Sequence, residues 1–201
     1  MEEKLIEKFK EYCEFSQDNV YVLLAISRTK ENEEHSSNTE PTMREVVDNE
    51  KDLEEKMKQL DHASKSYDSK FRLYISSNAR NSMKAFFRLR SEMDDWLQMR
   101  INGNEGIKKK FKRIDSEFKS VLQKNECKDE TNFIFDLDKA SRQDMKQLED
   151  DLRVLTDIKM VKSTPNGFHI VTGSFNYNEL ETGIDYELKK DGMIFVSYIG
   201  D

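Results

Sequence analysis

Two aspartates stand two residues apart at the end of a short apolar run, residues 133–137. In a β-strand, side chains i and i+2 project from the same face, so Asp136 and Asp138 are expected to lie side by side. Carboxylates this close repel each other unless a cation lies between them. Hard divalent cations such as Mg2+ and Mn2+ prefer carboxylate oxygens, and a pair of them can hold an in-line displacement at phosphorus. The spacing therefore indicates metal-dependent chemistry on a phosphate.

The residues that follow predict the elements that position this pair. Residues 142–155 carry apolar positions at helical spacing, and residues 158–161 form a short apolar strand. Residues 164–167, Thr-Pro-Asn-Gly, have strong turn chemistry, and the next apolar run, 168–171, contains His169. The segment is therefore expected to fold as strand, helix, strand, turn and strand, with two aspartates and one histidine near the strand ends.

This order of motifs resembles the archaeo-eukaryotic primase-polymerase superfamily. Its members have Asp-x-Asp on a strand, then a helix, then a turn of the type Thr-Pro-Ser-Gly-Gly-x-His that leads into the next strand. The counterparts here are Asp136-Leu137-Asp138 and residues 164–169, Thr-Pro-Asn-Gly-Phe-His. The resemblance covers roughly residues 71–200.

The family's third motif is an acidic residue on a later strand, followed by a turn and an apolar strand, and residues 184–196 resemble it. Glu187 fits best by its spacing to Asp191-Gly192, and Asp185 is the other candidate. The family usually has aspartate at this position, so the identity of the third acid stays open.

The resemblance implies a nucleotidyltransferase that joins nucleotides to a 3′-hydroxyl or forms a first dinucleotide. Asp136, Asp138 and the third acid would hold Mg2+ or Mn2+. His169 would contact the phosphates of the incoming nucleotide, beside the turn residues Thr164 and Asn166. The implied partners are nucleoside triphosphates and nucleic acid, either a single strand or a primer-template. One explanation of the small size is a minimal enzyme from a virus, plasmid or other mobile element that works with replication or defence proteins.

Two other hypotheses remain for these residues. The first is a primase-like fold that has lost catalysis and binds a nucleotide, a nucleic acid or a protein. The second is a phosphatase, in which the first aspartate of Asp-x-Asp is a nucleophile. That family has a hydroxyl residue two positions after the second aspartate, whereas this chain has Ala140 there. The phosphatase hypothesis is therefore the weaker of the two.

Asn78 and Arg80 lie between a predicted strand, 71–76, and a predicted helix, 82–98. A helix start offers free N–H groups and the positive end of a dipole, so both side chains are candidates for contact with a nucleotide or template. This expectation depends on the strand at 71–76 belonging to the same sheet as Asp136 and His169. An ordinary strand-to-helix turn is the alternative.

Basic residues mark two further candidate contacts with a nucleic-acid backbone. The only dense basic cluster in the sequence lies in the predicted helix 107–124 and consists of Lys108, Lys109, Lys110, Lys112 and Arg113. Arg28 and Lys30 follow the predicted strand 19–27. Solvated charges on a helix face or at a strand end are the alternative in both cases.

Composition limits the class of protein. The net charge is −7, which argues against a dedicated nonspecific DNA-binding protein but allows a local basic groove. With 36% charged residues but 12 phenylalanines and 7 tyrosines, a folded core is expected. Cys13 and Cys127 show no zinc-ligand spacing, and no apolar run is long enough to span a membrane, which favours a cytoplasmic protein without a membrane partner.

We expect a single α/β (α+β) domain over residues 1–201, in which 1–70 form an N-terminal part and 71–201 the core with both motifs. Its sheet is expected to be mixed, mostly antiparallel and flanked by helices, as in primase-polymerases. Residues 2–15 and 43–62 predict N-terminal helices, the second with Thr42 and Glu45 as a capping box. Residues 193–199 predict a closing strand after a hairpin turn at Gly192.

Overall fold

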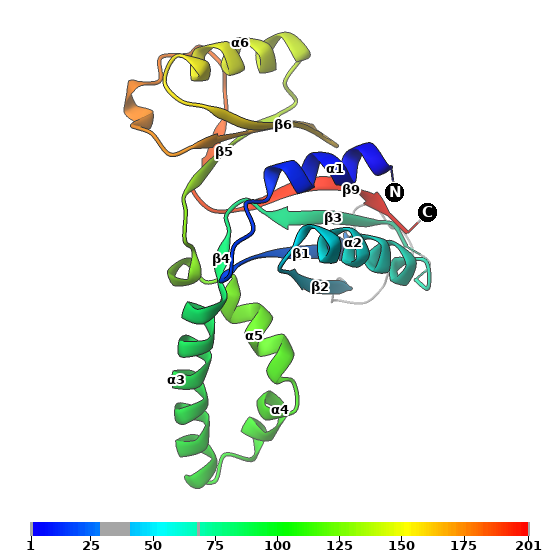
Figure 1. Cartoon of the computed structure of the whole chain (residues 1–201), viewed down its shortest axis with the longest axis vertical. Helices are drawn as coiled ribbons and strands as arrows, with labels where there is room; N and C mark the ends of the chain where they lie inside the picture. Colours follow the sequence, from blue (N-terminus) through cyan, green and yellow to red (C-terminus); the bar gives the residue numbers. More distant parts are fainter. Residues whose placement is uncertain (1, 29–40, 68, 201) are drawn as a thin grey trace.

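A computed structural model describes residues 2–28, 41–67 and 69–200 of the chain. It has a mixed α/β fold in which antiparallel strands are flanked by helices, as expected, but the strands form two sheets rather than one (Figure 1). In the first sheet the order is β2-β1-β3-β9, and a short β4 pairs with the start of β1. In the second sheet the order is β6-β7-β5-β8.

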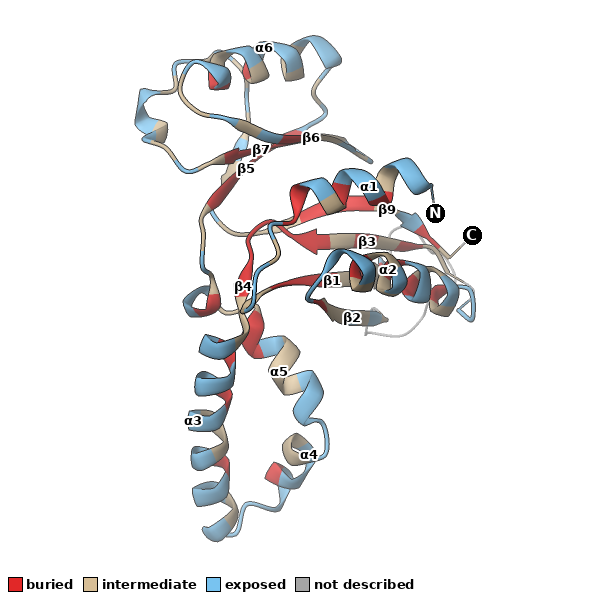
Figure 2. Ribbon diagram, viewed as in Figure 1, coloured by how far each residue is buried: buried red, intermediate tan, exposed pale blue. Residues whose placement is uncertain are grey.

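The strands of the first sheet come from both ends of the chain: β1 (Asn19–Ser27), β2 (Thr42–Val47), β3 (Phe71–Ser76), β4 (Arg80–Asn81) and β9 (Met193–Ile199). One face of this sheet is covered by α1 (Glu3–Tyr12) and α2 (Glu50–Ser64), as Figures 1 and 2 show. Alternation along β3 explains the two faces, because Leu73 and Ile75 are fully buried in the core with Phe9 and Met57.

The second sheet is built from one continuous stretch: β5 (Asn132–Asp138), β6 (Ile158–Thr164), β7 (Gly167–Gly173) and β8 (Glu187–Lys189). Helix α6 (Arg142–Arg153) covers it, and Leu148 and Leu152 of this helix pack against Phe135 and Ile170. A capping box between Ser141 and Asp144 fixes where α6 begins. The connection through the 3-10 turn η4 (Tyr177–Glu179) packs its aromatic rings onto the same core, so these rings are structural.

Helices between β4 and β5 form an arm that projects from the two sheets (Figure 1). The arm consists of α3 (Ser82–Ile101), η2 (Glu105–Ile107), α4 (Lys108–Phe111), α5 (Ile114–Leu122) and η3 (Asn125–Cys127). Leu89 and Trp96 of α3 meet Ile107 and Leu122 in a small apolar core that continues onto Val20 and Val22 of β1. None of the helices in the described part of the chain is long and apolar enough to cross a membrane.

Three local expectations were wrong. Residues 42–47 form β2 rather than the start of a helix, because each of them pairs with β1, and Asn49 instead caps α2 by accepting a hydrogen bond from the Asp52 N–H at 2.8 Å. The predicted helix 107–124 is divided into α4 and α5, which lets both pieces fold back on α3. The turn at Gly192 is not a hairpin, because β8 pairs with β5 whereas β9 pairs with β3.

Candidate active site between the two sheets

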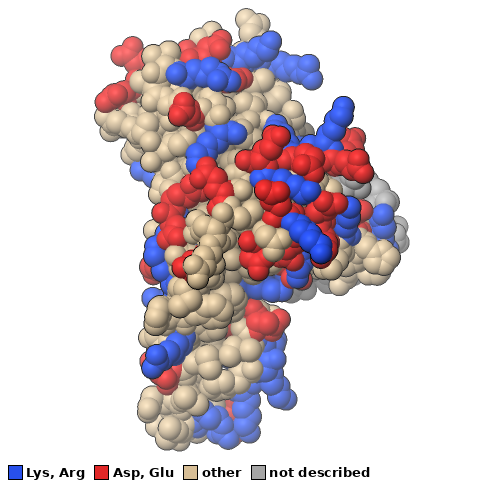
Figure 3. Space-filling view, viewed as in Figure 1, with Lys and Arg blue, Asp and Glu red and all other residues tan. Residues whose placement is uncertain are grey.

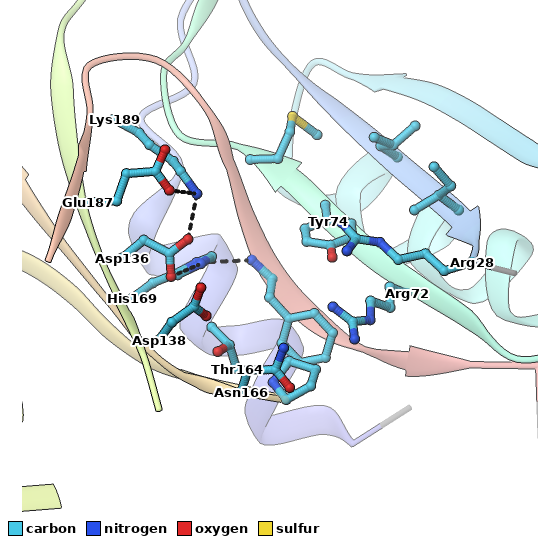
Figure 4. A pocket seen from close by; sticks show the side chains of 15 residues that line it. Arg28, Arg72, Tyr74, Asp136, Asp138, Thr164, Asn166, His169, Glu187 and Lys189 are labelled. Carbon is cyan, nitrogen blue, oxygen red and sulfur yellow. Dashed lines mark hydrogen bonds and ion pairs between the residues drawn. The ribbon is translucent and has the colours of Figure 1, made fainter. Parts of the chain in front are cut away.

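Strand register brings the acidic residues and the histidine together. On β5, Asp136 lies directly opposite His169 of β7 on one side and opposite Glu187 of β8 on the other. Asp138 follows on the same face of β5, opposite Gly167. Directly opposed residues have Cβ atoms about 5 Å apart, so three neighbouring strands present these side chains as one group (Figure 4).

This group forms one wall of a pocket of about 430 Å³ between the two sheets. The opposite wall belongs to the face of the first sheet that lies away from α1 and α2, and it includes Arg72 and Tyr74 of β3 together with Arg28 just after β1 (Figure 4). The described residues that line the pocket are Leu24, Ile26, Arg28, Arg72, Tyr74, Asp136, Asp138, Thr164, Pro165, Asn166, His169, Glu187, Lys189, Met193 and Phe195. Cations on one sheet therefore face carboxylates on the other.

Both carboxylate oxygens of Asp136 have partners. Oδ1 lies 3.4 Å from Nε2 of His169, and Oδ2 accepts a hydrogen bond from Nζ of Lys189 at 2.5 Å. The hydrogen bond from His169 and then the one from Lys189 outweigh the effect of partial burial, and they lower the pKa of Asp136 to about 2. Asp136 is therefore ionised throughout the physiological range.

His169 is buried and held on both ring nitrogens. The backbone N–H of Phe195 in β9 donates to Nδ1 at 3.4 Å, so Nδ1 is an acceptor and Nε2 is the nitrogen placed to donate to Asp136. This pair of contacts orients the ring toward the pocket and links β7 of the second sheet to β9 of the first. The imidazole thus has one defined orientation with its Nε2–H on the carboxylate side.

Lys189 places its ammonium between two carboxylates. Its Nζ lies 2.5 Å from Asp136 Oδ2 and 3.1 Å from Glu187 Oε2. Partial burial disfavours the charged amine, but the hydrogen bonds to the two carboxylates outweigh it and raise the pKa of Lys189. Asp136 and Glu187 thus share one cation, the ammonium of Lys189, which belongs to the same strand, β8, as Glu187.

The donor set suits a hard divalent cation, since it consists of carboxylate oxygens aimed at a shared positive charge. Asp138 adds an exposed carboxylate to the same pocket. Within the described ranges, however, no three acidic, histidine or cysteine side chains are gathered as a ready metal site. A divalent ion between Asp136 and Glu187 therefore has to displace the Lys189 ammonium.

The turn before His169 is fixed by close backbone approach. A Cβ on Gly167 would lie 1.8 Å from the carbonyl oxygen of Leu137, so this position in β7 accepts only glycine without a shift of the backbone. Beyond it, the N–H of Lys139 donates to the carbonyl of Asn166 at 2.6 Å. The end of β5 that carries Asp138 is thereby clamped to the turn that carries Thr164 and Asn166.

Seven of the sixteen site residues expected from the sequence meet in this pocket: Arg28, Asp136, Asp138, Thr164, Asn166, His169 and Glu187. Sequence reasoning missed Lys189, Arg72 and Tyr74. Residues 72 and 74 are the alternate positions of a strand whose other positions are apolar, so the alternation itself was a signal that they share one face. Asp185 is exposed and does not line the pocket, so of the two candidates for the third acid only Glu187 lies beside Asp136.

Asn78 and Arg80 do not face the pocket, which corrects their expected role. Arg80 is buried and forms two hydrogen bonds with Asp191, at 2.5 and 3.1 Å, and Asn78 donates to the same carboxylate at 3.0 Å. The expectation assumed that β3 shares a sheet with Asp136, whereas β3 and β5 belong to different sheets. These side chains join the sheets and are absent from the pocket lining.

The basic cluster lies on α4 and in the turn that follows it, toward the end of the arm and away from the pocket lining (Figures 1 and 3). Lys108 pairs with Glu105 at 2.6 Å, and Lys110 lies over the ring of Trp96 at 4.8 Å. Lys109, Lys112 and Arg113 are exposed. Lys30 lies outside the described residues.

Comparison with protein-family models, with curated proteins and with solved structures finds no match.

Proposed function

We propose that the chain is a metal-dependent nucleotidyltransferase, similar to a minimal primase-polymerase, that adds nucleotides to a 3′-hydroxyl. One observation carries the proposal: a single pocket joins Asp136, Asp138 and His169 of one sheet to Arg28 and Arg72 of the other. A phosphorylated substrate bound by a divalent cation requires both signs of charge in one place. A volume of about 430 Å³ lies within the range typical of small-molecule and cofactor sites.

Different residues of the pocket would contact different parts of a nucleotide substrate. Guanidinium groups recognise phosphate oxygens through paired N–H donors, so Arg28 and Arg72 suit the triphosphate. His169 lies next to the carboxylates, and its Nε2–H, which faces Asp136, would reach a phosphate oxygen only by leaving that carboxylate. Tyr74 presents an aromatic ring in the same wall as Arg72, which suits a base or sugar.

The carboxylates of the pocket suit the binding of the divalent cation. Asp136 and Asp138, with Glu187 as the third acid, are the residues that would hold Mg2+ or Mn2+. The ion would supply charge neutralisation of the triphosphate and activation of the attacking hydroxyl. Asp136 contributes a carboxylate that stays ionised, since its pKa is lowered to about 2. His169 keeps that carboxylate in one orientation.

The experiment that tests the proposal is extension of a labelled primer on a template, together with dinucleotide formation without primer, in Mn2+ and in Mg2+. The wild type is compared with Asp136→Asn and Asp138→Asn. Product from the wild type and a loss of about a hundredfold or more in each variant is expected, because removal of a ligand charge weakens transition-state stabilisation. Asp150→Asn is the matched control, because Asp150 is an exposed acid of α6 outside the pocket.

A second candidate function is nucleotide binding without transfer, and Lys189 favours it. Its ammonium already neutralises Asp136 and Glu187, so the pocket can bind a phosphorylated ligand through Arg28, Arg72 and Lys189 without a metal ion. Calorimetric titration of a nucleoside triphosphate in the presence of EDTA distinguishes the two. Tight binding in EDTA with no product in Mn2+ would support the binding function, whereas binding that requires Mn2+ would support transfer.

A further inference from the structure

The outer side of α3 carries a stripe of exposed residues that has no partner within the described chain. The stripe consists of Met83, Phe87, Arg90, Asp94, Leu97 and Ile101, all exposed. Phe87 is 64% exposed and Ile101 is 75% exposed, which is unusual for large apolar side chains on a regular helix. Neither Arg90 nor Asp94 forms an ion pair with another described residue.

The stripe has the geometry of a helix-pairing seam. Its spacings alternate between four and three residues, which is the heptad repeat. At 3.6 residues per turn the six positions fall within a sector of about 80°, and the stripe is about 27 Å long. The sector is nearly opposite the face of α3 that packs into the arm, where Ala85, Leu89 and Trp96 are buried. Helix α3 therefore has two faces built for packing, and the fold uses only one of them.

The stripe is complementary to itself when it is reversed. Met83 and Ile101 lie nine positions on either side of residue 92, Phe87 and Leu97 lie five positions on either side, and Arg90 and Asp94 lie two. A twofold axis at the level of residue 92 would therefore stack each apolar residue on an apolar one. The same axis would place Arg90 of each copy beside Asp94 of the other, twice in the pair.

We propose that a second copy of this chain pairs with α3 through this stripe, as an antiparallel two-helix interface. The charges decide between this occupant and others. A lipid surface or an apolar groove of another protein would supply no counter-charge, so Arg90 and Asp94 would be buried with only each other, four residues apart on one helix. A second copy supplies both counter-charges at the required positions, and it does so by symmetry.

The test uses the full chain and measures its mass in solution by light scattering and sedimentation over a wide concentration range. The wild type is expected to dimerise. Arg90→Asp gives each copy two acids at the centre of the stripe, and Asp94→Arg gives each copy two cations, so each variant alone should dissociate at least about tenfold more readily. An equimolar mixture of the two variants should form a heterodimer, and the double variant Arg90→Asp/Asp94→Arg should recover the homodimer.

Asp95→Arg is the matched control, because it makes the same charge change at the neighbouring exposed position, outside the stripe. It is expected to leave dimerisation unchanged. Leu97→Ser should weaken the dimer without unfolding the arm, since Leu97 points away from the arm core, and circular dichroism checks that the helix persists. A wild type that remains monomeric throughout, or a dimer that survives both single charge changes, would overturn the proposal. Binding of the monomer to anionic vesicles through Phe87 would also overturn it and identify a membrane occupant.

Discussion

Lys189 controls how much negative charge the pocket presents. Its ammonium contacts Asp136 and Glu187, so Asp138 is the one acid of the three in the pocket that pairs with no cationic side chain of the described residues. A lysine in this place can serve as a built-in counter-ion in the empty pocket, and a divalent cation would have to compete with it for the same oxygens. Both roles belong to the side chain of Lys189, so a substitution at this single position tests them.

Lys189→Gln is expected to tighten Mn2+ binding about tenfold, or about 1.4 kcal/mol, because the competing ammonium is removed while the carboxylates remain. Electron paramagnetic resonance of free Mn2+ during a titration measures this directly. Lys190→Gln is the control, since Lys190 is an exposed neighbour that contacts Tyr177 rather than the carboxylates. Equal Mn2+ affinity in the two variants and the wild type would show that Lys189 does not compete for the site.

Single residues were predictable where local spacing alone sets their geometry. Asp136 and Asp138 share a face because any strand places i and i+2 together, and the turn chemistry of residues 164–167 placed His169 at the start of the next strand. Lys189 and Arg72 were missed because their role depends on which strands are neighbours. That pairing is a long-range property that local pattern does not contain.

At the scale of elements, the β5–β7 pairing depends on one glycine. Gly167→Ala is expected to destabilise the chain by about 2 to 4 kcal/mol, because the added methyl group meets the backbone oxygen of Leu137 at 1.8 Å and the strands must separate. Urea denaturation measures the loss. Gly183→Ala is the control, because nothing lies within 4 Å of its added Cβ. An equal effect of the two substitutions would contradict the role of the close approach.

The contact between α1 and α2 is expected to weaken in acid. Lys10 donates to Glu54 at 2.8 Å, and this hydrogen bond, followed by the one from Lys58, lowers the pKa of Glu54 from 4.5 to about 2. Because the folded-state pKa is depressed, the stabilisation is complete above about pH 4.5 and is lost as the pH falls toward 2. The difference in urea midpoint between wild type and Glu54→Gln should therefore shrink over that range. Glu55→Gln, which removes only a surface pair with Lys51 at 3.7 Å, should show a smaller pH-dependent difference.

Elements with one strong periodicity were predictable, whereas those stabilised by a partner were not. Residues 71–76, 82–98 and 142–155 fold close to their expected bounds because alternation or helical spacing is clear in each. Residues 42–47 carry apolar positions compatible with either structure, and six backbone pairings with β1 decide for a strand. The backbone hydrogen bonds to β1 thus outweighed the capping box that the sequence predicted at Thr42 and Glu45.

At the scale of the whole molecule, Asp191 joins the two sheets. It lies between β8 and β9 and accepts hydrogen bonds from Arg80 and Asn78, while Asn78 in turn accepts from the N–H of Asn132 at the start of β5. This network connects the end of the first sheet, the base of the arm and the start of the second sheet. This partly buried carboxylate therefore helps to set the relative position of the two pocket walls.

Asp191→Ala is expected to destabilise the fold by about 3 to 5 kcal/mol, because Arg80 is left buried without its counter-charge. Chemical denaturation measures this loss. The double variant Arg80→Met/Asp191→Leu should recover part of it, since no charge remains to be buried. Asp185→Ala, an exposed acid, should change stability by less than about 0.5 kcal/mol. A neutral Asp191→Ala would show that other contacts hold the sheets together.

The antiparallel α/β class was predictable from the strand and helix patterns, but the division into two sheets was not. The expected single sheet placed the strand 71–76 together with the strands that carry Asp136 and His169. β9 instead pairs with β3, so the whole second sheet is inserted between two adjacent strands of the first. The pocket arises from this insertion, because its two walls face each other where the chain leaves and re-enters the first sheet.

The same insertion has a consequence during synthesis on the ribosome. The edge of β3 that β9 will cover is made early, and it remains open while the arm and the entire second sheet are translated. An apolar strand with an unpaired edge is a site for wrong pairing and aggregation. The second sheet is formed by one continuous stretch and can close first. We expect pulsed hydrogen exchange during refolding to protect β5–β7 before β3, so that the pocket is among the last parts of the molecule to form.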